Sequence, residues 1–367
     1  MDMTSSGNQR LQSNLRTDGG ESAISVGIIG AGVAGAGAAY ALRDMNAQVR
    51  IFEKSRGVCG RAATRRKNGC RYDHGANYIK DADARTTELI PTLGTDGLVD
   101  IGKPVWTFEE DEEISSGESR EEYKWTWENG MTQLAKRLLA ETTASVQNQT
   151  QIESLSYISS DNTWSITDTE GTRYGAFDVV LLTPPAPQTA DILAQSEWND
   201  PHREDLITAV RDIDYRTVRT VVLHYPFRES YPWYALVNTD KNHPIGWASR
   251  EECKTNHVPD GESLFIVQMS PDWSTEHYDA PVETAADDTA QKLAALLDDS
   301  RYLEYDWADD QGWRYALPNN GIETHQTEYG QQAGLYIAGD WVAGRGRVNE
   351  ALWNGYDAAS EVAEAHL

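Results

Sequence analysis

Residues Val26–Arg61 decide the fold, and they read VGIIGAGVAGAGAAYALRDMNAQVRIFEKSRGVCGR. Gly30, Gly32 and Gly35 form the pattern GxGxxG between an apolar strand-like run and an alanine-rich helical run. In such a unit the first glycine permits a tight turn, the second lets the backbone approach a pyrophosphate, and the third lets the helix pack on the strand. The helix start then offers unpaired N–H groups to the phosphates. The stretch therefore predicts a dinucleotide-binding strand–turn–helix–strand unit.

The second strand of this unit, QVRIFE, ends in an acidic residue, Glu53. A carboxylate at that point can accept hydrogen bonds from the ribose hydroxyls of an adenosine, which a merely buried Gly/Ala-rich helix would not explain. Residues 56–61 follow directly, and we expect them to form a loop beneath the nucleotide. An arginine there can pair with diphosphate oxygens, and a glycine leaves room for them.

The end of the chain, GLYIAGDWVAGRGRVNEALWNGYDAASEVAEAHL, supplies a second signal. We interpret it as a strand, Asp340, a glycine-rich turn and a helix from about Val348. Asp340 can accept from ribityl hydroxyls, and the partial positive charge of a helix start near Arg347 suits a reduced, anionic flavin. Alone, Gly339-Asp340 would be only a turn with a capping aspartate. Joined to the first pattern, it favours FAD over a bare nicotinamide site.

Between these ends the patterns predict an α/β, Rossmann-like FAD-binding domain with an inserted antiparallel β-sheet plus helix as the substrate domain. The apolar run Val179–Leu182 before two prolines is typical of a buried parallel strand. Residues 103–127 alternate aromatic and acidic side chains, as in a surface hairpin. The expected boundaries are a disordered tail at 1–23, the FAD-binding domain at 24–100, 127–190 and 320–367, and the substrate domain at 101–126 and 191–319.

The composition limits the partners. Asp and Glu number 58 against 32 Lys and Arg, so the formal net charge is −26. Such a surface repels nucleic acid and anionic membranes, and it indicates a salt-rich (halophilic) cytoplasm in which ions screen the self-repulsion. The three cysteines show neither a disulfide framework nor metal-ligand spacing, so we expect no metal. The chain shows no secretion signal, and the glycines of the run from Ser25 to Leu42 favour a nucleotide fold over a membrane span.

Several segments, in their order along the chain, resemble the renalase-type branch of the flavin amine oxidase superfamily. These are VGIIGAGVAGAGAA, EKSRGVCGRAATRR, YDHGANYI, ENGMTQLAKRLL, LTPPAPQ, PDWSTEHYD, GWRYALP and GLYIAGDWVAGRGRVNEALWNG. The resemblance implies non-covalent FAD and oxidation of a small donor with O2 as acceptor. Proteins called renalase oxidise dihydropyridine isomers of NAD(P)H and release H2O2. The expected cofactor-binding residues are Gly30, Gly32, Gly35, Glu53, Lys54, Gly60, Arg61, Gly75, Ala76, Ile152, Gly339, Asp340, Arg347 and Val348.

Cys59 departs from the resemblance, because the family usually has a glycine there. If the position requires a positive φ, a cysteine is strained in it. Covalent attachment of flavin to Cys59 is disfavoured, since this loop is expected near the phosphates and away from the ring. A small buried filler is the preferred interpretation.

Dihydropyridine oxidation demands little of the protein's side chains, because the donor becomes aromatic as it loses hydride and needs no general base. The protein must hold two flat rings in contact and exclude water. We therefore take aromatic residues as candidates for the substrate wall, with ordinary core packing as the alternative for each. They are Trp313, Tyr315, His74 and Tyr78. Trp273, His277 and Arg314 are open between the pocket and plain packing or ion pairing.

Three functions remain open at this stage. A renalase-like oxidase leads, with a small-molecule electron donor and O2 as partners. A flavin amine oxidase or desaturase is second, and it would be expected to show an aromatic cage and often a lysine near flavin N5. A non-catalytic FAD-binding protein is third. The oligomeric state is left open.

Overall fold

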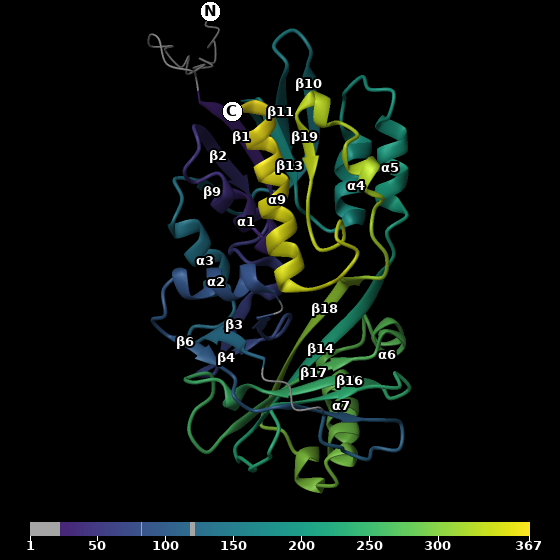
Figure 1. The fold of residues 1–367 in the computed structure, drawn as a ribbon. Helices are drawn as coiled ribbons and strands as arrows, with labels where there is room; N and C mark the ends of the chain where they lie inside the picture. The colour runs from purple at the N-terminus through teal and green to yellow at the C-terminus, as the bar shows by residue number, and fades with distance from the viewer. Residues whose placement is uncertain (1–22, 82, 118–121) are drawn as a thin grey trace, which may run out of the picture.

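The computed structural model describes residues 23–81, 83–117 and 122–367, so the tail expected at 1–23 lies outside the described residues apart from Ala23. Figure 1 shows a parallel sheet with its helices in the upper half and a large, mostly antiparallel sheet in the lower half. Two long strands, β14 (Tyr215–Tyr225) and β18 (Trp307–Pro318), run between the halves. None of the helices in the described ranges is long and apolar enough to cross a membrane.

The parallel sheet has the order β19–β13–β1–β2–β9, with the strand of the glycine pattern at its centre. Its strands are β1 (Ile24–Ile29), β2 (Ala47–Phe52), β9 (Ser145–Gln147), β13 (Val179–Leu182) and β19 (Leu335–Ile337). The last strand comes from the end of the chain and pairs in parallel with β13. This arrangement confirms the predicted Rossmann-like α/β fold class, and it confirms the parallel strand expected at 179–182.

Helix α1 (Val33–Ala41) follows the glycine turn, and α9 (Val348–His366) packs against it. Small residues make this contact possible: a Cβ on Gly355 would lie 2.1 Å from the carbonyl oxygen of Ala34. The helix predicted from about Val348 therefore begins at that residue and fastens the end of the chain onto its first motif. Two further helices in this half are α2 (Ala84–Thr92) and α3 (Thr132–Ala140).

A smaller antiparallel sheet carries two helices and extends the upper half. Its elements are β10 (Ile152–Ile158), β11 (Thr163–Asp168), β12 (Arg173–Phe177), α4 (Ala186–Gln195) and α5 (Arg203–Arg211). Helix α5 lies beyond the predicted boundary at 190, yet Leu206 and Val210 share a hydrophobic core with β10 and β13. The hydrophobic core of the first domain thus continues past residue 190, and we propose that the domain boundary lies near residue 214.

The lower half is a six-stranded sheet in the order β18–β14–β17–β16–β15–β7, in which β7 alone pairs in parallel among these strands. Its remaining strands are β7 (Val105–Phe108), β15 (Ala235–Asn238), β16 (Ile245–Arg250) and β17 (Ser263–Met269). Helix α7 (Val282–Leu296) contacts β14, β16 and β18, and the short α6 (Pro271–Glu276) contacts β14. An antiparallel sheet with a helix was the architecture expected here.

The hairpin predicted at 103–127 is wrong. Its first part, β7, joins the large sheet beside β15, whereas its last part, β8 (Lys124–Trp127), pairs with β5 (Ile79–Lys80) and β6 (Leu98–Asp100). Strand β8 is buried at all four positions, so its aromatic residues Trp125 and Trp127 belong to a hydrophobic core and not to an exposed hairpin. The remaining pair of strands is a true hairpin, β3 (Thr64–Lys67) with β4 (Cys70–Asp73). A short helix, α8 (Thr324–Thr327), precedes β19.

Candidate active site

The three glycines of the first motif serve different purposes in the structure. Gly30 has φ +98°, a conformation that L side chains rarely adopt. A Cβ on Gly35 would lie 2.0 Å from the Gly30 carbonyl oxygen, so helix and turn touch directly. A Cβ on Gly32 would meet nothing within 4 Å and would project into open space at the start of α1. That open space in front of the helix N-terminus is where a diphosphate would fit.

Glu53 lies directly after β2 and is 6% exposed. Its Oε2 accepts from the backbone N–H of Ala31 at 2.8 Å, and its Oε1 accepts from that of Ser55 at 2.7 Å. These bonds fix the carboxylate against the glycine turn. A carboxylate offers about four acceptor positions, so two bonds leave room for ribose hydroxyls.

Cys59 is in the left-handed region, with φ 86°, and its side chain is buried. Position 59 therefore does have a positive φ, in which a cysteine is strained. Its thiol donates to the Met131 carbonyl oxygen at 3.4 Å, and burial raises its pKa to about 12. A thiol that stays protonated and faces a core is a poor nucleophile, so the geometry favours the filler over covalent flavin attachment.

The two ends of the chain meet at an ion pair. The Arg61 guanidinium donates to Asp340 Oδ1 at 2.7 Å and to the carbonyl oxygen of Ala316 on β18 at 3.0 Å. Asp340 is 5% exposed. Arg61, from the loop whose arginines were expected near the diphosphate, thus bonds to the carboxylate expected at the ribityl chain and positions it. The adjacent Gly339 receives support from α9, since its N–H donates to Asn354 Oδ1 at 2.8 Å.

The loop after β4 is pressed against this junction. A Cβ on Gly75 would lie 1.9 Å from the Arg61 carbonyl oxygen, and that oxygen also accepts from the Ala76 N–H at 3.0 Å. Gln268 donates to the Gly75 carbonyl oxygen at 2.7 Å, and the Trp313 indole donates to the His74 carbonyl oxygen at 3.2 Å. The small residues expected beside a flat ligand thus lie between both chain ends and the large sheet.

His74 is held as a neutral imidazole. Burial, helped by the nearby charge of Arg65, lowers its pKa to about 4. Its ring lies against Trp313 with centroids 5.3 Å apart. Its Nδ1 is buried and has no hydrogen-bond partner among the described residues. Such a group neither carries charge nor exchanges a proton readily near neutral pH.

The other wall candidates lie on two sides of the junction. The ring centroids of Tyr78 and Trp247 lie 6.4 Å apart. Burial raises the pKa of Tyr78 to about 12, and the positive charge of Arg347 partly opposes this rise. Arg347 caps α9 directly before Val348. Tyr315 on β18 contacts the ring of Tyr215 at 5.6 Å. Three of the four wall candidates therefore lie on segments that meet at this junction, and they are His74, Trp313 and Tyr315. Gly75 and Ala76 lie on the same segment as His74.

Some sequence candidates lie apart from this junction. Lys54 is exposed and lies 3.3 Å from Gln188, beside an open cleft that Arg56 also lines. Ile152 is the first residue of β10, and its buried side chain packs in a hydrophobic core. Trp273 stacks on His277 at 4.2 Å and donates to Asp288, and Arg314 lies over Tyr278 at 5.3 Å. Ring stacking, a hydrogen bond and a cation–π contact are thus the observed contacts of Trp273, His277 and Arg314.

Sequence reasoning missed two polar groups next to the junction. Gln268 sits on β17 opposite Thr220 of β14, and the Thr220 hydroxyl is buried with no hydrogen-bond partner among the described residues. Both residues lie in segments whose sequence predicts a β-strand but gives no indication of a functional site. The pairing that brings Gln268 to Gly75 joins residues 193 positions apart.

A cluster of buried charges lies behind the same loop. Lys254 is fully buried and donates to Asp73 Oδ2 at 2.9 Å and to Glu251 Oε1 at 2.7 Å, while His257 Nδ1 lies 2.7 Å from Glu251 Oε2. Burial alone would raise the pKa of Asp73, but the charges of Lys254 and His257 outweigh it and hold the pKa below its usual value. Asp73 also accepts from the Met131 N–H, so the cluster anchors the segment that carries Gly75.

The geometry is that of a nucleotide fold whose far end meets a second sheet, and comparison with known proteins identifies the family. Residues 28–90 match the NAD(P)-binding Rossmann-like domain, and residues 100–363 match the flavin containing amine oxidoreductases. The chain belongs to the flavin-containing amine oxidoreductase family. It is accordingly an FAD-dependent oxidoreductase, as the resemblance implied. The residues fit FAD, because Gly32 leaves open space before α1 while Asp340 is held near the flavin end.

Individual relatives of this flavin-containing amine oxidoreductase support the fold. The chain is 36% identical over 69 residues to protoporphyrinogen oxidase 2 of Arabidopsis thaliana, a match that covers 19% of this chain and 14% of that protein. A candidate protoporphyrinogen oxidase of Exiguobacterium sp. 255-15 has a TM-score of 0.73 at 15% identity, over 95% of this chain and 100% of that one. Cyclohexylamine oxidase of Brevibacterium oxydans has a TM-score of 0.69 at 14% identity, over 93% and 99%.

Proposed function

We propose that this flavin-containing oxidoreductase is a renalase-like oxidase, which takes hydride from dihydronicotinamide isomers of NAD(P)H with O2 as final acceptor. The observation that carries the proposal is the state of the ionisable groups around Gly75. His74 is buried and neutral, and Lys254 is bound between Asp73 and Glu251. A donor that needs no general base suits such a site, because its product is an aromatic cation.

When bound, FAD supplies the hydride acceptor and passes the electrons to O2, giving H2O2. The residues of this chain position and shield the reacting rings. Gly75 and Ala76 pack closely on the Arg61 carbonyl oxygen and so fix the loop next to the chain ends, and Gln268 holds the same backbone from the large sheet. The Trp313 side chain excludes water beside His74. Arg347 and the start of α9 provide positive charge for a reduced cofactor.

Oxidation of an amine is the second candidate. It is favoured by the likeness to cyclohexylamine oxidase and by the aromatic rings of Trp313, Tyr78 and Trp247. The likeness to protoporphyrinogen oxidases adds a cyclic tetrapyrrole donor to the candidates. Lys254 lies behind the Gly75 loop, but its ammonium is already bound by two carboxylates. It is therefore poorly placed to act as the lysine expected near flavin N5 in an amine oxidase.

The test is anaerobic mixing of the FAD-loaded protein, in high salt, with reduced nicotinamide isomers, amines and protoporphyrinogen. We expect dihydronicotinamide isomers to bleach the flavin fastest, and we expect Trp313→Ala to slow bleaching about 10- to 100-fold with FAD content unchanged. Bleaching by amines or protoporphyrinogen alone would overturn the substrate assignment. Bound flavin that no donor bleaches would favour the non-catalytic alternative.

We propose further that the protein works in concentrated salt inside the cytoplasm, an inference that rests on its net charge of −26. Screening shortens from about 10 Å at 0.1 M salt to about 3 Å at 1 M, so repulsion among the carboxylates should fall steeply. We expect the thermal midpoint of the holoenzyme to rise between about 0.1 M and 2 M KCl. A midpoint that stays level on dialysis into low salt would contradict this.

A further inference from the structure

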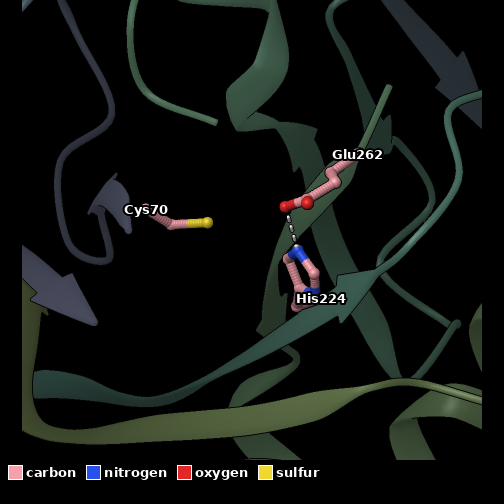
Figure 2. A group of neighbouring side chains, drawn as sticks. All are labelled: Cys70, His224 and Glu262. Carbon is pink, nitrogen blue, oxygen red and sulfur yellow. Dashed lines mark hydrogen bonds and ion pairs between the residues drawn. The ribbon is translucent and has the colours of Figure 1, made fainter. Parts of the chain in front are cut away.

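We propose that Cys70, His224 and Glu262 form a binding site for one divalent transition metal ion of the zinc class. The three come from the β3–β4 hairpin, from β14 and from the turn before β17. Their ligand atoms all lie within 4.8 Å of one another. Figure 2 shows the Cys70 sulfur pointing toward the Glu262 carboxylate and the His224 ring.

The three ligand groups lie in a sheltered position. Cys70 is 1% exposed and His224 is 4% exposed, whereas the Glu262 side chain is 35% exposed. His224 Nε2 lies 2.9 Å from Glu262 Oε2, and it donates to that carboxylate in the metal-free form. The partial exposure of Glu262 leaves an entry path for the ion and for a water as a fourth ligand. Three protein ligands plus water is a common zinc arrangement.

The histidine is already oriented for ligation. Its other ring nitrogen, Nδ1, lies 3.3 Å from Asp306 Oδ2 without a hydrogen bond in this structure, and it is close enough for a protonated Nδ1 to donate to that carboxylate once a metal ion occupies Nε2. Its ring also stacks on Trp307, with centroids 5.0 Å apart and an angle of 10°. The Nε2 atom is thereby directed at the space shared with Cys70 and Glu262.

The chemistry of the set selects the ion. A thiolate and an imidazole favour zinc or cobalt over magnesium or calcium, which prefer oxygen ligands. On binding, the Cys70 thiol loses its proton to solvent, and the ring proton of the neutral His224 shifts from Nε2 to Nδ1 beside Asp306, so the imidazole stays neutral. The dipositive ion then neutralises one thiolate and one carboxylate, so no net charge remains among the ligands.

The second group with metal-ligand chemistry, Asp73 with Glu251 and His257, differs in one decisive respect. The Lys254 ammonium already lies 2.9 Å and 2.7 Å from its two carboxylates and occupies the place of a cation. No comparable ammonium is bonded to the Cys70 group in the described part of the chain. Zinc at Cys70 would tie the hairpin that leads into His74 and Gly75 to the large sheet.

The test uses the holoenzyme, stripped with a chelator and dialysed against zinc with excess magnesium in high salt. We expect about one zinc per chain by elemental analysis, and an X-ray absorption spectrum with one Zn–S distance of about 2.3 Å. Asp306→Asn should weaken binding about 10- to 100-fold. Cys70→Ser should abolish the Zn–S distance in the spectrum. Glu262→Gln should keep that distance but weaken zinc binding.

The matched control is Cys253→Ser, because Cys253 is a free, partly buried cysteine that lies outside the group. We expect it to keep both the zinc and the Zn–S distance. A wild-type holoenzyme that binds no zinc, a spectrum with oxygen and nitrogen ligands only, or equal binding by Cys70→Ser would overturn the proposal. Glu262 is partly exposed, so its variant tests the site even if Cys70→Ser fails to fold.

Discussion

Gly32→Ala should yield a folded protein that has lost FAD. A Cβ at this position would meet no protein atom within 4 Å, so the chain itself tolerates it. It would stand in the open space before α1 that we assign to the diphosphate. We expect FAD affinity to fall about 100-fold, which corresponds to about 3 kcal/mol. Equilibrium dialysis measures the affinity, and circular dichroism of the apoprotein reports the fold.

Two further variants separate binding from folding. Gly102→Ala is the matched control, because its Cβ would also meet nothing within 4 Å and the residue follows β6, outside the glycine motif and the loop at 56–61. It should retain both FAD and fold. Gly35→Ala would place a Cβ 2.0 Å from the Gly30 carbonyl oxygen, so it should disrupt the apoprotein as well. Undiminished FAD affinity in Gly32→Ala would show that the diphosphate lies elsewhere.

Lys254→Met should cause the largest loss of stability of any single change considered. The substitution keeps much of the side chain's volume but leaves the carboxylates of Asp73 and Glu251 buried without their cation. Removing one partner of a buried ion pair costs about 3–5 kcal/mol. We expect the thermal midpoint to fall by several degrees. Lys292→Met is the control: its pair with Asp288 is partly exposed, so the cost should stay below about 1 kcal/mol.

The pH dependence provides an independent check on Lys254→Met. In the wild type the pKa of Asp73 is lowered, so its contribution is present above its unfolded pKa near 4 and is lost as the pH falls through the folded pKa. In the variant the buried Asp73 carboxylate has lost its cation, so protonation is favoured and the pKa of Asp73 rises. The stabilising protonation of Asp73 is then lost as the pH increases. The difference in thermal midpoint should widen from about pH 4 to pH 7, and a constant difference would contradict this account.

The sequence was most informative where a local motif had a local cause. Gly30 and Gly35 meet constraints within their own turn, and the helix start at Val348 follows from composition nearby. The hairpin at 103–127 failed because aromatic–acidic alternation does not say which sheet a strand joins. Strands β7 and β8 are separated by only a short stretch of chain, yet they belong to different sheets.

Contacts between distant segments were beyond such reasoning. Arg61 donates to Asp340, and no pattern near either residue encodes that pairing. Gln268 reaches Gly75 only because β17 lies in the large sheet. The cysteines were judged by their spacing along the chain, and that test is blind to a group such as Cys70 with His224, whose members come from separate strands.

The bond between Arg61 and Asp340 spans 279 positions of the chain, and this separation dictates the order of events during synthesis. Strand β19, Asp340 and α9 are made long after β1 and α1. Until they are made, β13 is an uncovered sheet edge, and α1 lacks the helix that packs on it. A chain cut before β19 would therefore expose this edge and would lack Asp340, the partner of Arg61.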